Sequence, residues 1–131
     1  MSIQKTKTTA SDSPKRAVTL EDEMMKLPTL KHVGLALVEF VYSLQKGTFV
    51  EKKTEWIYEP TKFVAFGFPK RHPEQIRLQF KQFYPHYGDE KDKDMLKIYA
   101  GRFNHGKCLI TSPRQLACAA KYIELSFLHP F

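Results

Sequence analysis

The chain has 131 residues, a formal net charge of +7, 42% hydrophobic residues and two cysteines. This length predicts one domain, because a single core stops growing only at roughly twice this size. Residues 1–20 lack the apolar core of a secretory signal, and no apolar run approaches the roughly 20 residues of a membrane span, so we expect no membrane partner. Two cysteines without a C-x-x-C pair favour a reducing, cytoplasmic setting over a secreted one.

The first 18 residues differ in composition from the rest of the chain. They contain no aromatic residue and consist mainly of Ser, Thr, Lys, Ala and Asp. Such a segment cannot bury enough apolar surface to compensate for the entropy lost on ordering. We therefore predict a disordered basic tail over residues 1–18, which carries +3 of the net charge, and a single domain over residues 19–131.

Two helices are predicted after the tail. A short one is expected over Thr19–Lys26, capped by its first residue and with acidic residues in its first turn. A longer helix is expected to be capped by Thr29 and to stop at a left-handed Gly47. Apolar residues recur at helical spacing over Leu30–Leu44, and others widen this arc beyond one stripe. The helix is therefore expected to be deeply packed or to share a second partner, such as another subunit.

The middle of the chain changes to a period of two. Phe49–Tyr58 is predicted as a strand or irregular edge, and Lys62–Phe68 as a central strand, because it is apolar on both pleat faces. Ile76–Phe83 alternates between apolar and polar residues, which predicts a strand with one buried face. Tyr84–Asp94 is predicted as a charged loop. For Met95–Tyr99 the pattern is too short to decide between helix and strand.

The last part of the chain predicts a strand followed by a capped helix. Cys108–Thr111 is apolar and partly β-branched. Ser112 is expected to be the N-cap, with Pro113 at the first helical position and Gln115 completing a capping box. An apolar stripe follows at Leu116, Ala119, Ala120, Ile123 and Phe127. Together the elements predict an α+β fold, an antiparallel sheet of three to four strands with the N- and C-terminal helices packed on one face.

Several local strings carry a family resemblance, namely Thr61–Phe66, Ile76–Phe83, Gly101–Gly106 and Ser112–Leu125. Together they resemble an uncharacterised family of small domains that occur alone or at the C-terminal end of longer nuclease-like or predicted transport proteins. The central strand of that family begins with a lysine followed by an aromatic and an aliphatic residue, as Lys62-Phe63-Val64 does here. The resemblance spans roughly residues 35–127. It implies the α+β fold, and it implies no catalytic or binding residues.

The distribution of charge gives the main functional expectation. Met95–Ile123 contains five basic residues and no acidic one. A basic surface favours encounters with nucleic acid, anionic membranes or acidic proteins without choosing among them, and it also occurs in proteins with no polyanion partner. Our lead hypothesis is a small non-enzymatic domain that binds an anionic partner, nucleic acid first. The candidate nucleic-acid-binding residues are Arg77, Lys81, Arg102, Lys107, Arg114 and Lys121, of which Arg114 and Lys121 have the spacing of one helix side.

Two other hypotheses remain open. One is a protein-interaction module or homodimer that uses the Leu30–Leu44 helix. The other is an enzyme with an unrecognised site where Tyr99, Arg102 and His105 would converge. His105 and Cys108 are three residues apart, but Cys108 opens a strand expected to be buried, so we predict a core cysteine rather than a nucleophile. The histidines are scattered singly, and no metal site, cofactor or catalytic residue is predicted.

Overall fold

The computed structural model describes residues 18–53, 55–70, 72–80, 94–100 and 105–128. The elements in chain order are α1 (Leu20–Met25), α2 (Lys31–Leu44), β1 (Thr48–Lys52), β2 (Glu55–Glu59), β3 (Val64–Gly67), β4 (Ile76–Phe80), β5 (Tyr99–Ala100), β6 (Gly106–Ile110), the 3-10 turn η2 (Pro113–Gln115) and α4 (Leu116–Leu128). None of these described helices is long and apolar enough to cross a membrane. Of the predicted tail, only Val18 is described.

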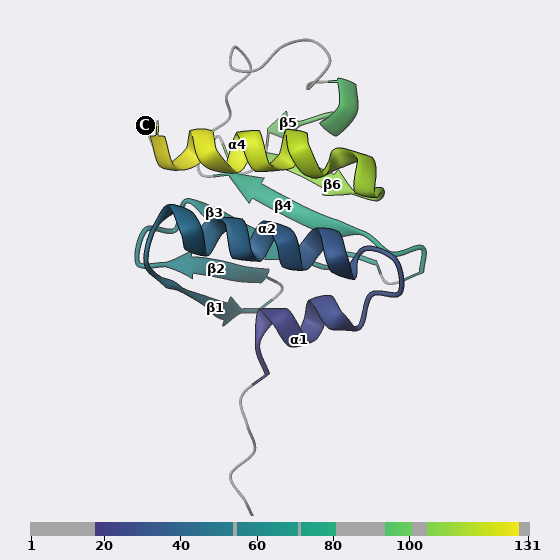
Figure 1. Cartoon of the computed structure of the whole chain (residues 1–131), viewed down its shortest axis with the longest axis horizontal. Coiled ribbons are helices and arrows are strands. Elements are labelled where there is room, and N and C mark those ends of the chain that lie inside the picture. The colour runs from purple at the N-terminus through teal and green to yellow at the C-terminus, as the bar shows by residue number, and fades with distance from the viewer. Residues whose placement is uncertain (1–17, 54, 71, 81–93, 101–104, 129–131) are drawn as a thin grey trace, which may run out of the picture.

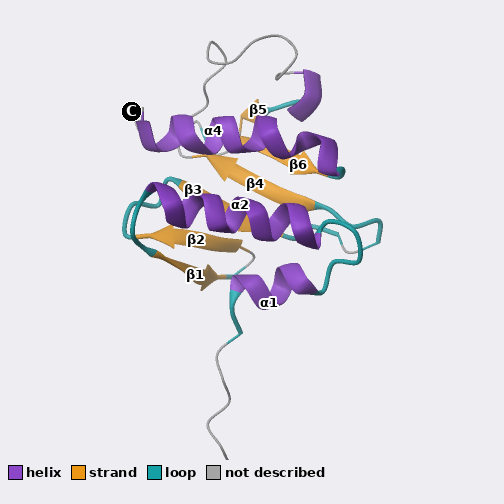
Figure 2. Cartoon of the chain, viewed as in Figure 1, coloured by secondary structure: helices purple, strands orange, loops and turns teal. Residues whose placement is uncertain are grey.

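The strands form one antiparallel sheet in the order β1-β2-β3-β4-β6-β5. Figure 1 shows α2 and α4 side by side in front of this sheet, with α1 beside α2. Figure 2 shows the two layers directly, with the helices on one side of the strands. The α+β class and the placement of both helices on one face are therefore as predicted.

The core lies between the helices and one face of the sheet. Trp56, Phe66, Leu78 and Cys108 are paired in register from β2 to β6 and form one buried row. Along β4 and β6 every second residue is buried, so the alternation predicted for β4 is confirmed over its described part. All four residues of β3 are buried, as expected of a central strand.

The sheet contains six strands rather than three to four. The predicted strand over Phe49–Tyr58 is two strands, because a turn at Lys53, with φ 45°, reverses the chain between β1 and β2. The segment Met95–Tyr99, for which the sequence did not decide between helix and strand, contains part of each. Residues 94–96 are helical, and Tyr99–Ala100 pair with β6 as a two-residue strand that is too short to give a periodic pattern.

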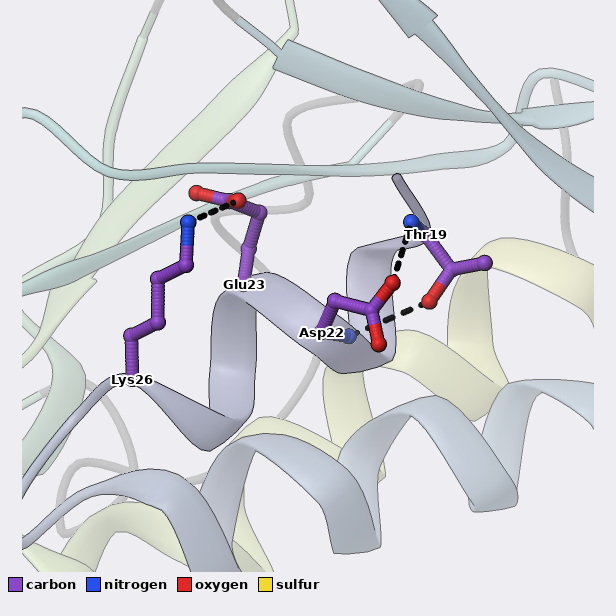
Figure 3. A network of polar contacts seen from close by, with 4 residues as sticks. All are labelled: Thr19, Asp22, Glu23 and Lys26. Atoms are coloured by element: carbon purple, nitrogen blue, oxygen red, sulfur yellow. Dashed lines mark hydrogen bonds and ion pairs between the residues drawn. The ribbon is translucent and has the colours of Figure 1, made fainter. Parts of the chain in front are cut away.

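The start of α1 confirms the predicted cap. The Thr19 hydroxyl accepts a hydrogen bond from the Asp22 amide at 3.1 Å, and the Asp22 carboxylate accepts one from the Thr19 amide at 3.0 Å. Figure 3 shows this reciprocal pair together with the 2.9 Å ion pair between Lys26 and Glu23 one turn on. The two hydrogen bonds between Thr19 and Asp22 satisfy two backbone amides that would otherwise have no partner at the start of a helix.

The start of α2 differs from the prediction. Leu30 is its N-cap and makes no side-chain hydrogen bond, so the cap predicted at Thr29 is wrong. Glu74, which lies shortly before β4, supplies the acceptor instead. Its carboxylate accepts hydrogen bonds from the Thr29 amide at 3.0 Å and the Leu30 amide at 3.1 Å. Glu74 thus links the segment before β4 to the N-terminus of α2, where the helix dipole is positive. Because Glu74 is 44 residues from Leu30, no local sequence pattern indicates this contact.

The end of α2 also differs from the prediction. The helix stops at Leu44, with the extended Gln45 as its C-cap, and Gly47 does not adopt the left-handed conformation. Gly47 is required for another reason, since a Cβ atom there would lie only 2.4 Å from the Glu59 carbonyl oxygen. The glycine lets the chain leaving α2 pass close to the end of β2.

The wide apolar arc of α2 is used within the protein. The helix contacts α1 on one side and α4 on the other, and its residues Val33, Gly34, Leu37, Val38 and Val41 are buried. The large hydrophobic side chains that are exposed among the described residues lie elsewhere, at Val18, Met25, Tyr99 and Leu128. The breadth of the arc, which suggested a second subunit, is thus explained by the neighbouring helices.

Candidate functional site

We call the face of the sheet opposite α2 and α4 the open face; Figure 1 shows these two helices on the other side of the strands. Its residues alternate with the buried rows and are paired across strands. One row crosses all six strands at Val50, Ile57, Ala65, Gln79, Lys107 and Tyr99. The neighbouring row contains Lys52, Glu55, Gly67, Arg77 and Leu109.

Two predicted site residues meet on the open face. Arg77 on β4 lies opposite Leu109 on β6, and Lys107 on β6 lies opposite Gln79 on β4. Arg77 and Lys107 are therefore diagonal neighbours on adjacent strands, a relation that places side-chain origins about 7 to 8 Å apart. Both side chains are half-buried along their length, as expected of cations whose stems cover a sheet surface.

Leu109 also lines a hollow of about 460 Å³ at the edge of the sheet, which we call the edge hollow. It lies between the segment 95–99 and the start of η2. Its lining residues are Met95, Leu96, Lys97, Tyr99, Leu109, Thr111, Ser112, Arg114 and Gln115. Two of them are cations, and none is a carboxylate. Among the described residues, no ion pair involves Lys97, Lys107 or Arg114.

Gln115 holds the walls of the edge hollow together. Its side-chain oxygen accepts hydrogen bonds from the amides of Thr111 at 2.7 Å and Ser112 at 3.1 Å. Its side-chain nitrogen donates to the carbonyls of Met95 at 3.0 Å and Leu109 at 3.2 Å. The predicted capping box is thus confirmed, and the same residue also fixes the segment before β5 to the end of β6.

The structure brings together only part of the predicted set. Arg77, Lys107 and Arg114 surround Leu109. Lys121 lies on the exposed side of α4, in the helix layer, on the other side of the sheet. Arg114 belongs to the 3-10 turn η2 rather than to α4. The separation of seven residues between Arg114 and Lys121 therefore does not place them on one side of an α-helix. Lys81 and Arg102 fall outside the described residues.

Two residues of the edge hollow were not among the nucleic-acid-binding candidates, although Tyr99 was named for the possible enzyme site. Lys97 has φ 53°, which places it in the left-handed region between the helical residues 94–96 and β5. Tyr99 is 45% exposed and shares the face of Lys107. Both lie in the stretch from Met95 to Ile123, which contains no acidic residue, and this absence could have identified Lys97 as a candidate anion-binding residue. Nothing local indicated that the ring of Tyr99 is exposed, because its burial depends on the strand at the sheet edge.

A second, smaller hollow of about 240 Å³ lies near the middle of the open face. Ile57, Ala65, Gln79 and His105 are among its lining residues, and the small side chain of Ala65 explains the depression. The Gln79 amide nitrogen lies 2.9 Å from Nδ1 of His105. This contact orients the imidazole across β4 and β6.

His105 and Cys108 lie on opposite sides of the sheet. His105 lines a hollow of the open face, whereas Cys108 belongs to the buried row beneath the helices and is 0% exposed. Burial raises the pKa of the Cys108 thiol to about 12. The core cysteine expected at this position is confirmed, and Cys118 on α4 is half-buried.

The geometry of an enzyme site was also predicted, with Tyr99, Arg102 and His105 converging. Tyr99 lines the edge hollow and His105 lines the central one, so these two do not share a pocket, and Arg102 is outside the described residues. Among the described residues, no group of three or more His, Cys, Asp or Glu side chains could hold a metal ion.

Comparisons with protein-family models, with curated proteins and with solved structures found no match to this chain. The resemblance to the uncharacterised small-domain family therefore stays a prediction.

Proposed function

We propose that this protein binds nucleic acid through the β4–β6 side of the open face and the adjoining edge hollow. The observation that carries the proposal is the gathering of Arg77, Lys97, Lys107 and Arg114 around Leu109. Phosphate backbones are bound by several cations spread over a surface rather than by one deep site. The described residues that line the edge hollow include two cations and no carboxylate, which favours an anionic ligand further.

The form of the surface also suits a polymer. The open face is a sheet surface that mixes apolar, polar and cationic side chains with one carboxylate, Glu55, and the two hollows lie along it. Interfaces with nucleic acid are more positively charged than those between proteins. The exposed large hydrophobic side chains among the described residues are scattered, whereas many protein-binding surfaces carry a continuous apolar patch.

The test is binding of fluorescein-labelled 20-nucleotide RNA and DNA to the full chain, followed by anisotropy from 25 to 300 mM KCl. For three or four phosphate contacts to a single strand, the slope of log K against log salt is about −2 to −3. The dissociation constant should then rise roughly 20- to 50-fold between 50 and 200 mM. Lys107→Ala should weaken binding and reduce the slope by about 0.7.

The matched control is Lys121→Ala, which removes the same charge from the helix side of the molecule. A full-length variant with Lys5 and Lys7 changed to Gln measures what the N-terminal cations add. The proposal is wrong if no nucleic acid binds at 25 mM KCl, or if Lys121→Ala weakens binding as much as Lys107→Ala. Binding to anionic phospholipid vesicles without binding to nucleic acid would also overturn it.

A further inference from the structure

Tyr99 is the only aromatic residue among the exposed large hydrophobic side chains of the described chain, at 45% exposure. The other described aromatics are buried or packed against the core, several of them in ring contacts such as that of Phe49 with Tyr58 at 4.8 Å. An aromatic ring that stays exposed on a sheet face does not gain the free energy of apolar burial when the protein folds. At the edge hollow, beside Leu109, this ring offers an apolar surface on which a flat ligand could stack.

The backbone segments that carry the cations beside Tyr99 are held in place by the fold. Lys97 is two residues before Tyr99, and Arg114 is on the opposite wall, in the turn capped by Ser112. Gln115 connects these walls by its hydrogen bonds to Met95 and Leu109. The hollow is thus largely formed before any ligand arrives, and its volume is within the ~300 to 1,000 Å³ typical of small-molecule sites.

We infer that the ligand is a single-stranded nucleic acid, with one base stacked on Tyr99 in the edge hollow and the flanking phosphates at Lys97 and Arg114. This inference rests on the proposed function and specifies its ligand. A flat base offers the aromatic surface that Tyr99 can cover, and the adjacent phosphates match the two cations. In a duplex the base faces are stacked on one another and cannot reach the ring, so a duplex would use the cations alone.

The test compares four probes on the full chain at 50 mM KCl. They are a 12-nucleotide single strand, an abasic strand of the same length, the corresponding duplex and inorganic polyphosphate. The single strand should bind at least about 5-fold more tightly than the abasic strand, because one stacked base strengthens binding roughly 5- to 160-fold. Tyr99→Phe should retain this difference, and Tyr99→Leu should remove most of it.

A matched control is Leu128→Ala, which truncates an exposed apolar residue in the helix layer and should change nothing. A 2-aminopurine base placed along the strand should lose fluorescence on binding to the unaltered protein and recover it in Tyr99→Leu. Equal affinity for base-bearing and abasic strands, or tighter binding of the duplex, overturns the inference while leaving nucleic-acid binding intact. Failure of all four probes to bind overturns the inference together with the proposed function.

Discussion

At the scale of single residues, Gln115 has the largest structural role near the candidate site. It is 8% exposed, and its amide makes four hydrogen bonds to backbone groups of three segments. Its predicted role in a capping box involves only the Ser112 amide. The contact to Met95 depends on a segment 20 residues away in the chain, and no local pattern could have indicated it.

Replacing Gln115 by Ala should lower the free energy of unfolding by about 2 to 3 kcal/mol, because several backbone groups would lose their partner. Urea unfolding followed by circular dichroism measures this loss. Gln45→Ala is the matched control, since its side chain is exposed, and it should stay within about 0.5 kcal/mol. Equal stability of the two variants would show that the Gln115 contacts do not hold the hollow together.

The two cysteines should differ in reactivity. Cys108 is 0% exposed and burial raises its pKa from 9.0 to about 12, so it carries almost no thiolate at pH 8. Cys118 is half-buried on α4. A thiol reagent such as Ellman's should therefore modify one thiol per native chain at pH 8 and two in urea. Rapid modification of both thiols in the native protein would contradict the burial of Cys108.

The raised pKa of Cys108 also predicts the direction of a pH effect on stability. The folded protein holds this proton more tightly than the unfolded chain does. The resulting stabilisation is fully present below the ordinary pKa of 9.0, and it is lost as the pH rises through about 12. Urea midpoints measured from pH 8 to 10 should fall, and Cys108→Ala should show a smaller fall than Cys118→Ala.

At the scale of elements, the packing of α2 and of the chain that leaves it depends on two glycines. A Cβ atom at Gly34 would lie 2.2 Å from the sulfur of Met24, at the contact of α2 with α1. A Cβ atom at Gly47 would lie 2.4 Å from the backbone oxygen of Glu59. The first neighbour is a flexible side chain that can move, whereas the second is backbone within the sheet.

Gly47→Ala should therefore destabilise the protein by about 1 to 3 kcal/mol, the usual cost of inserting a methyl group into a packed region. Gly34→Ala should cost less, because alanine gains about 1 kcal/mol of helix propensity and Met24 can adopt another rotamer. Thermal unfolding of both variants tests the order. A larger loss for Gly34→Ala would mean that α1 and α2 cannot adjust at their contact.

The link between Glu74 and α2 should be sensitive to acid. Desolvation acts to raise the pKa of Glu74, but hydrogen bonds from the Leu30 and Thr29 amides outweigh it and lower the pKa below 4.5. Its contribution is present above that ordinary value and lost as the pH falls through the folded-state pKa. Glu74→Ala should reduce the melting temperature at pH 7 and have less effect at pH 2.5. Glu51→Ala, at an exposed position on β1, is the control.

At the scale of the whole molecule, one layer of helices covers one face of the sheet, and the wide apolar arc of α2 is used against α1, α4 and the sheet. We therefore expect a monomer of 15.3 kDa in sedimentation equilibrium at micromolar concentration. A dimer would instead favour the hypothesis of a protein-interaction module, which the Leu30–Leu44 pattern suggested. In that case Val18, Met25 and Leu128 would be the first positions to change, because they are exposed and apolar.

The sequence alone determined several local features whose signals are short-range, although the cap predicted at Thr29 and the stop predicted at Gly47 were wrong. The caps at Thr19 and Ser112, the alternation of β4 and the burial of β3 followed from spacing and residue type, and the structure confirms them. These features depend on neighbours within one or two turns or on the two faces of a strand, so the chain specifies them before it folds.

Only the tertiary structure decided which distant residues meet. The pairing of β4 with β6 placed Arg77 beside Lys107, and the hydrogen bonds of Gln115 brought Lys97 and Tyr99 to Arg114. The same packing put Lys121 on the far side of the sheet. Strand register and the order of strands are set by contacts between segments far apart in the chain, and charge spacing along the sequence carries no information about them.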